Sequence, residues 1–258
     1  MDRHLTEAEK MSFDEEGYLI IRDLLHSRET SELQQWAQEI HDAPVNANST
    51  LMPYEEIDAH GRHILCRTEN FANSHAELNS LLRGEKLLSV LRDLSGEDML
   101  LFKEKINYKL AGAGGDAAHI DSSAYTHVKK IKHLAVNIAV DSMTPSNGGL
   151  EIVKGSHKMH VPIAADNCIE PAWIVSQAWI PVELAAGDAL ILGSSLARRI
   201  SCEYEPTGPE GVVCDVQLCW RRRPARRVLC ETEGGVATYS FAEGWRDVRG
   251  WCAEVWVW

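Results

Sequence analysis

The sequence of 258 residues lacks any apolar run near the ~18 residues that cross a bilayer. No two cysteines stand in CxxC spacing, and an odd count of seven argues for reduced thiols rather than a disulfide framework. The opening residues, Met-Asp-Arg-His-Leu-Thr-Glu, are polar and do not resemble a signal or transit peptide. These absences predict a cytoplasmic protein without a membrane segment.

An excess of positive charge is also lacking. Acidic residues outnumber basic ones by 38 to 26, a formal net charge of −12, which argues against a nucleic-acid or anionic-membrane partner. The chain is 45% apolar, too apolar for a disordered protein, and it shows no internal repeat. We therefore expect a globular fold.

Lysine is missing after Lys158 and histidine after His160. Residues 198–258 instead contain nine arginines, five of the eight tryptophans and five of the seven cysteines. The sequence thus predicts a well-patterned domain over residues 1–197 and an atypical tail over residues 198–258. Two interpretations of the tail stay open: a genuine Arg/Trp-rich interaction surface, or a segment read out of frame.

The first hundred residues carry helical patterns. Residues 28–41 place apolar side chains at helical spacing and predict an amphipathic helix. Residues 76–94 do the same, with Gly84 as a break into two helices and Gly96 as a stop. Residues 17–22 predict a short strand between a helical turn around Phe13 and the first long helix.

After Gly96 the pattern becomes that of short strands and tight turns. The turn Thr144-Pro-Ser-Asn-Gly-Gly is typical of residues that tolerate positive φ. Helices followed by short strands predict an antiparallel sandwich or barrel with N-terminal helices, a mainly β fold. The expected strands span residues 99–110, 133–140, 150–153, 179–184 and 187–192.

The motif His119-Ile-Asp121 is the main candidate for chemistry. Residues i and i+2 of a strand point to one face, so an imidazole and a carboxylate converge. Such a pair supplies two ligands of a two-His-one-carboxylate iron site. The motif alone is weak, since a loop histidine beside an unrelated aspartate also produces it.

Several motifs together resemble the phytanoyl-CoA dioxygenase family of Fe(II)/2-oxoglutarate oxygenases over about residues 10–197. They are His119-Ile-Asp121, the run from Asn147-Gly-Gly to Gly-Ser-His157, Gly187-Asp188-Ala-Leu-Ile-Leu-Gly-Ser, Phe13-x-x-x-Gly17-Tyr-Leu-Ile, and Cys66-Arg-Thr-Glu-Asn-Phe71. The resemblance implies a double-stranded β-helix, or jelly roll, with Fe(II) in its mouth. The implied reaction oxidises 2-oxoglutarate with O₂ to succinate and CO₂ and hydroxylates or desaturates a small molecule, such as a secondary metabolite or small polar compound.

The resemblance also implies roles for individual residues. His119 and Asp121 match the first two iron ligands, and Lys105 and Asn107 stand where family members contact 2-oxoglutarate, although both fit a solvent-facing strand equally well. Tyr125 and Thr126 would line the substrate mouth or merely pack at its rim.

The sequence departs from the family at the third ligand, where Arg198 stands in place of a histidine and offers no lone pair to a metal. A family-typical arginine for the far carboxylate of 2-oxoglutarate has no match near Pro209. Codons can be chosen for residues 213–219 that, read one base later, encode Cys-Ala-Thr-Tyr-Asn-Cys, similar to the family's closing strand. We therefore predict a frame shift near residue 197, a jelly roll incomplete at its C-terminal end, and weak or absent binding of Fe(II) and 2-oxoglutarate.

Two other functions stay open. A catalytically inactive member of the family could serve as partner subunit of an active oxygenase, since arginine and tryptophan are enriched in interface cores. Homo-oligomers and hetero-oligomers with a related oxygenase are both compatible with this sequence. A metal-free ligand-binding jelly roll is the third reading, and it leaves His119 and Asp121 unexplained.

Overall fold

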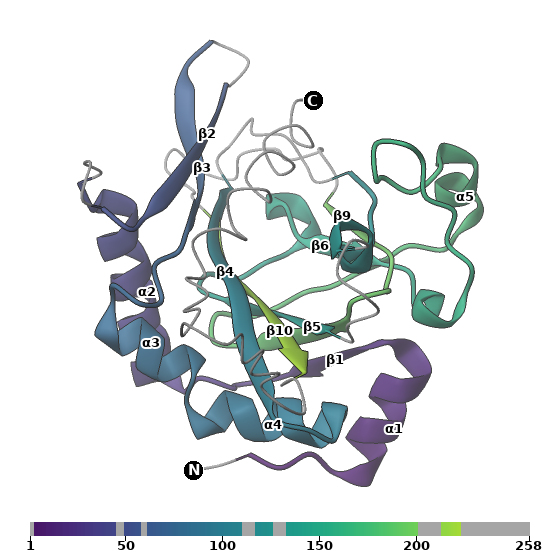
Figure 1. The fold of residues 1–258 in the computed structure, drawn as a ribbon, viewed down its shortest axis with the longest axis horizontal. Helices are drawn as coiled ribbons and strands as arrows, with labels where there is room; N and C mark the ends of the chain where they lie inside the picture. Colours follow the sequence, from purple (N-terminus) through teal and green to yellow (C-terminus); the bar gives the residue numbers. More distant parts are fainter. Residues whose placement is uncertain are drawn as a thin grey trace, which may run out of the picture.

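The computed structural model describes residues 3–44, 49–57, 61–109, 117–125, 133–200 and 213–222. Two antiparallel sheets dominate these residues (Figure 1). The large sheet has the order β1-β8-β5-β10-β4-β3-β2 and the small sheet the order β7-β6-β9. The strands are β1 Tyr18–Ile21, β2 Met52–Ile57, β3 His63–Glu69, β4 Met99–Lys109, β5 His133–Ala139, β6 Leu150–Ile152, β7 Ile180–Pro181, β8 Ala189–Gly193, β9 Arg198–Ile200 and β10 Val213–Arg222.

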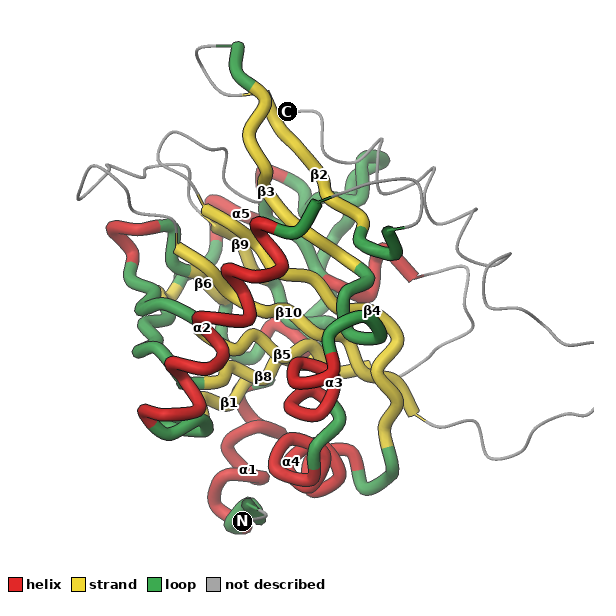
Figure 2. The backbone as a smooth tube through the Cα atoms, turned by 90° about the vertical axis from the view of Figure 1, so that its left-hand side faces the viewer, coloured by secondary structure: helices red, strands yellow, loops and turns green. Residues whose placement is uncertain are grey.

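Helices from the first hundred residues cover one side of the large sheet, as Figure 2 shows for α2, α3 and α4. We call the sheet face toward these helices the outer face and the opposite one the inner face. The helices are α1 Glu7–Glu16, α2 Ser27–Asp42, α3 Ala76–Leu82, α4 Glu85–Ser95 and α5 Pro171–Ser176, with short 3-10 turns η1 Asp121–Tyr125, η2 Pro145–Asn147 and η3 Ser156–Lys158.

The helix predictions are confirmed. Helix α2 buries Leu33, Ala37 and Ile40, the stripe expected from their spacing. Gly84 separates α3 from α4, and Gly96 ends α4 in the left-handed conformation with φ of 73°. Gly96 supplies the positive φ at the end of α4, whereas Gly84, with φ of −76°, has an extended backbone and lies where an added Cβ would approach the Ser80 carbonyl oxygen to 2.8 Å.

The outer face carries the main hydrophobic core. Strand β10 contributes Val216, Leu218 and Trp220, all fully buried with the apolar residues of the helices. Alternation along the strand turns Asp215, Gln217 and Cys219 to the inner face. One strand thus supplies apolar side chains to the helices and polar ones to the interior between the sheets.

The inner face packs against the small sheet at one end of the molecule. Ala135 of β5 and Leu190 and Leu192 of β8 form a second core with Leu150 and Ile152 of β6. Two facing antiparallel sheets with helices on one side are the predicted jelly-roll architecture. The expected strands at residues 99–110, 133–140, 150–153, 179–184 and 187–192 are all present, although β7 is only two residues long.

Two features of the sheets differ from expectation. The hairpin of β2 and β3 was not predicted, because its end around Ile57 and His63 is exposed and has no apolar stripe on a packed face. The expected loss of the closing strand is wrong: β10 pairs along its length with β4, with a bulge between Cys219 and Trp220, and pairs with β5 on its other side. The division of the chain at residue 197 stays a prediction.

Candidate metal centre

The backbone fixes His119 beside Arg198. The two residues form an antiparallel bridge, in which the His119 N–H donates to the Arg198 carbonyl at 2.9 Å and the Arg198 N–H donates back at 3.0 Å. Asp121 opens η1, and the next residue, Ser122, donates its N–H to the carbonyl of Ser194 at 2.8 Å. The segment that carries the HxD motif is therefore held to the end of β8 and the start of β9.

The side chains of His119 and Asp121 converge as predicted. The His119 Nε2 atom lies 3.6 Å from Asp121 Oδ1. The His119 Nδ1 atom lies 2.7 Å from the carbonyl oxygen of Ala117, which assigns the proton to Nδ1 and leaves Nε2 as the atom that faces the carboxylate. The expected reason was wrong, because Asp121 begins a 3-10 turn rather than continuing a strand. The turn brings the carboxylate back toward the imidazole.

Arg198 meets the same carboxylate. Its Nη2 atom lies 2.5 Å from Asp121 Oδ1, and both side chains are buried. Burial by itself raises the pKa of Asp121, but the adjacent Arg198 guanidinium, with a smaller contribution from the neighbouring His119, outweighs it and holds that pKa well below its usual range. Asp121 is therefore a carboxylate with an internal cation as partner.

This set of residues does not fit a three-ligand iron centre. A facial triad needs two imidazoles and a carboxylate, whereas Arg198 has no lone pair and already binds the carboxylate. Within the described ranges, no group of three or more His, Cys, Asp or Glu side chains is placed to hold a metal ion. Two donors, His119 and Asp121, remain.

The predicted co-substrate residues lie on the inner face of β4. Lys105 stands between Glu69 of β3 and Gln217 of β10. Asn107 stands opposite Asp215, and its Nδ2 donates to Asp215 Oδ2 at 3.2 Å. The amide donor expected to meet 2-oxoglutarate therefore binds a carboxylate of this chain. The co-substrate roles of Lys105 and Asn107 stay predictions.

The predicted substrate residues are only partly described. Tyr125 ends η1 close to the HxD motif in sequence, and nothing further is described of its side chain. Thr126 lies outside the described residues.

Three groups on the inner face were missed by sequence reasoning. Asn137 of β5 donates through Nδ2 to Asp215 Oδ2 at 3.0 Å, and both residues are buried. Cys219 lies close enough to Asp121 to feel its charge, and burial raises the pKa of its thiol to about 11. The alternation of residues 213–220 could have placed Asp215 and Cys219 on one face of a strand. It could not have shown which strands flank that strand.

A buried ion cluster lies near these residues. The Glu69 carboxylate forms ion pairs with Lys103 at 3.2 Å and with Arg67 at 3.3 Å. The Arg67 guanidinium also stacks 4.1 Å above the ring of Tyr54. The family-like stretch at residues 66–71 thus contributes charged side chains that form ion pairs within the fold, although Arg67 Nε and Glu69 Oε1 are buried without a hydrogen bond among the described residues.

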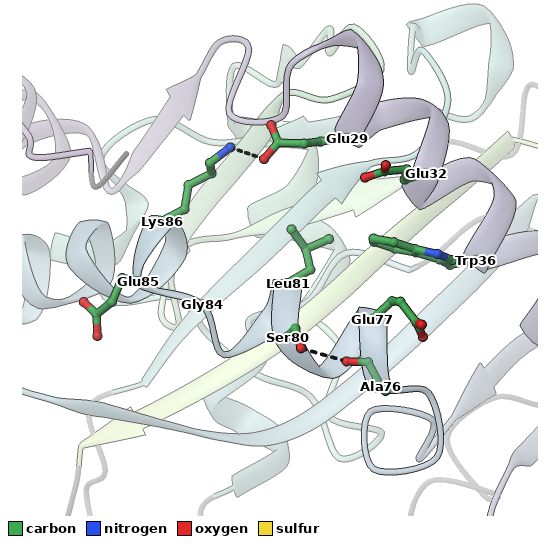
Figure 3. A pocket seen from close by; sticks show the side chains of 10 residues that line it. All are labelled: Glu29, Glu32, Trp36, Ala76, Glu77, Ser80, Leu81, Gly84, Glu85 and Lys86. Atoms are coloured by element: carbon green, nitrogen blue, oxygen red, sulfur yellow. Dashed lines mark hydrogen bonds and ion pairs between the residues drawn. The ribbon is translucent and has the colours of Figure 1, made fainter.

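A surface groove of about 550 Å³ lies away from these residues, between α2 and the helices α3 and α4 (Figure 3). Its lining includes the carboxylates of Glu29, Glu32, Glu77 and Glu85, with Lys86 directed at Glu29. This acidic lining is unsuited to a dicarboxylate, so the groove is not a candidate for co-substrate binding.

Comparison with known proteins identifies the family of the chain. The model of the family described as phytanoyl-CoA dioxygenase (PhyH) matches residues 13–197. The chain belongs to this family. The phytanoyl-CoA dioxygenase match ends one residue before Arg198, the position at which the sequence departs from the expected ligand pattern.

Relatives with curated functions are dioxygenases and hydroxylases. Dioxygenase lolE1 from Epichloe uncinata is 37% identical over 186 residues, which cover 71% of this chain and 72% of the relative. Methylphosphonate hydroxylase from Gimesia maris is 33% identical over 195 residues, with 75% and 74% covered. The predicted membership in a dioxygenase family is thus confirmed.

Solved structures share the fold at low identity. EctD from S. alaskensis, solved with 2-oxoglutarate and 5-hydroxyectoine, has a TM-score of 0.72 and 16% identity over 84% of this chain and 76% of its own. The non-heme alpha ketoglutarate-dependent epimerase SnoN has a TM-score of 0.67 and 16% identity, with 90% and 88% covered. EctD has also been solved with bound iron. Of the helices described here, none is long and apolar enough to span a membrane.

Proposed function

We propose that this chain is an Fe(II)/2-oxoglutarate oxygenase in which His119 and Asp121 are the remaining iron ligands and Arg198 replaces the third. The observation that carries this proposal is the approach of His119 Nε2 to Asp121 Oδ1 at 3.6 Å in a member of a dioxygenase family. The Arg198 guanidinium takes up the Asp121 carboxylate, so the chain holds iron weakly and turns over slowly if at all.

The substrate class follows from the relatives. Their names point to a methylphosphonate, a 2-aminoethylphosphonate and ectoine, all compact polar molecules. We infer a small polar substrate for the three-ligand form of this site, hydroxylated or desaturated at a C–H bond. The polar inner face supports this, since side chains such as Lys105 and Gln217 are of the kind that bind small polar molecules.

The test restores the missing ligand. Arg198→His supplies an imidazole and frees Asp121, whereas the matched control Arg198→Ala frees Asp121 without adding a ligand. Anaerobic calorimetry with Mn(II) is expected to show at least tenfold tighter binding for the histidine variant than for the alanine variant. Equal affinities in the two variants would contradict the roles of His119 and Asp121.

The ion pair of Arg198 and Asp121 also favours a second function, that of an inactive partner subunit. A carboxylate that is neutralised by a buried arginine is a poor iron ligand, as expected of an inactive member of the family. Co-expression with an active relative, followed by size-exclusion chromatography and a succinate assay, separates the two functions. A stable mixed complex with activity from the relative alone supports the partner role, and succinate from the isolated chain after iron reconstitution excludes it.

A further inference from the structure

The inner face of β10 presents a carboxylate where an anionic co-substrate is expected. Asp215 is directly opposite Asn107 in the pairing of β10 with β4. Its Oδ2 atom accepts from Asn107 Nδ2 at 3.2 Å and from Asn137 Nδ2 at 3.0 Å. Two amide donors from the two flanking strands therefore converge on one oxygen.

These donors belong to a buried site. Asp215 is 1% exposed and Asn137 is 5% exposed. Inside a protein, a carboxylate oxygen that accepts two amide hydrogens is held in place, because leaving would strand the donors without partners. Asp215 is therefore a fixed part of the inner face.

A dicarboxylate that bound at this position would compete with Asp215 for the same amide donor. It would take the Asn107 amide as hydrogen-bond donor, and it would bring a second negative charge next to a buried one. Two neighbouring carboxylates repel each other strongly in a poorly screened protein interior. While Asp215 stays in its observed position, the Asn107 amide is occupied and a second negative charge is unfavourable.

We propose that Asp215 is a specificity-determining residue that takes the place of a ligand carboxylate and excludes 2-oxoglutarate and other small dicarboxylates from Asn107. The proposal rests on the proposed oxygenase function, with Asn107 in the co-substrate role that the family resemblance predicts for it. Arg198 and Asp215 then act as a pair of internal substitutes: Arg198 is the cation at Asp121, and Asp215 is the anion at Asn107.

The test needs no metal. Asp215→Asn removes the charge and keeps an acceptor oxygen for the neighbouring amides. Glu104→Gln is the matched control, since it removes a buried carboxylate from the outer face of the same sheet. Titration with 2-oxoglutarate alone, followed by ligand-observed NMR, is expected to give at least tenfold tighter binding for Asp215→Asn than for the unaltered chain or the control.

Equal binding in Asp215→Asn, Glu104→Gln and the unaltered chain would overturn the proposal. If asparagine disturbs the strand, as far-UV circular dichroism would show, Asp215→Ser removes the same charge with a smaller side chain. Mn(II) binding to Arg198→His addresses the iron ligands separately. Failure of that metal binding alone counts against the proposed function, whereas failure of 2-oxoglutarate binding in Asp215→Asn alone counts against the exclusion.

Discussion

The two faces of β10 differ in which side chains they can accept. On the outer face, Val216, Leu218 and Trp220 join the core beneath the helices, where any apolar side chain of suitable volume fills the space. On the inner face, Asp215 and Cys219 lie among groups whose chemistry depends on residue identity. The apolar residues of β10 therefore pack the core, whereas the interactions of its inner residues depend on the chemistry of each side chain.

The same contrast applies to Arg198. Its backbone makes the bridge to His119 that a histidine at this position would also make, since both hydrogen bonds use main-chain atoms. Its side chain instead forms an ion pair with the Asp121 carboxylate. A substitution can thus keep a residue's place in the fold and still change the site. The fold here depends on the main-chain hydrogen bonds of Arg198, whereas the site depends on its side chain.

The largest effect is expected on the outer face. Trp220→Ala removes a fully buried ring and should lower the free energy of unfolding by about 4 kcal/mol, measured by urea denaturation. Trp220→Phe is the control and should cost much less, because the indole Nε1 is buried without a hydrogen-bond partner among the described residues. A loss below about 1 kcal/mol for the alanine variant would show that β10 is not part of the core.

The next effect is expected at the ion pair on the inner side. Arg198→Ala leaves the Asp121 carboxylate buried beside His119 alone and should cost about 3 kcal/mol in chemical denaturation. The double variant with Asp121→Ala should recover part of that loss, because no uncompensated charge is left. Strictly additive losses in the double-mutant cycle would show that the two side chains do not interact.

The smallest effect is expected at Glu104, a carboxylate on the mainly apolar outer face. It accepts the N–H of Ala72 at 3.1 Å, and burial raises its pKa. The folded state therefore holds the proton to higher pH than the unfolded state, so this group costs stability as the pH rises above its unfolded pKa. Glu104→Gln should gain stability relative to the unaltered chain between pH 4 and pH 7, and parallel stability curves would contradict the assignment.

Much of the fold was predictable from local patterns. The helix stripe of α2, the end of α4 at Gly96 and the strand of residues 99–110 depend on spacing and backbone freedom, which are local properties. The hairpin of β2 and β3 was not predictable in the same way, since its exposed half has no packed face to impose a pattern. The place of β10 between β4 and β5 depends on long-range pairing.

For the candidate site, the sequence by itself determined which chemical groups are present: His119 and Asp121 two residues apart, and Arg198 where a third ligand is expected. Only the tertiary structure decided how they are used. It set the Arg198 guanidinium on the Asp121 carboxylate and the Asn107 and Asn137 amides on Asp215. The physical reason is that ion pairs and side-chain hydrogen bonds depend on distances between residues far apart in the chain, and only sheet pairing fixes those distances.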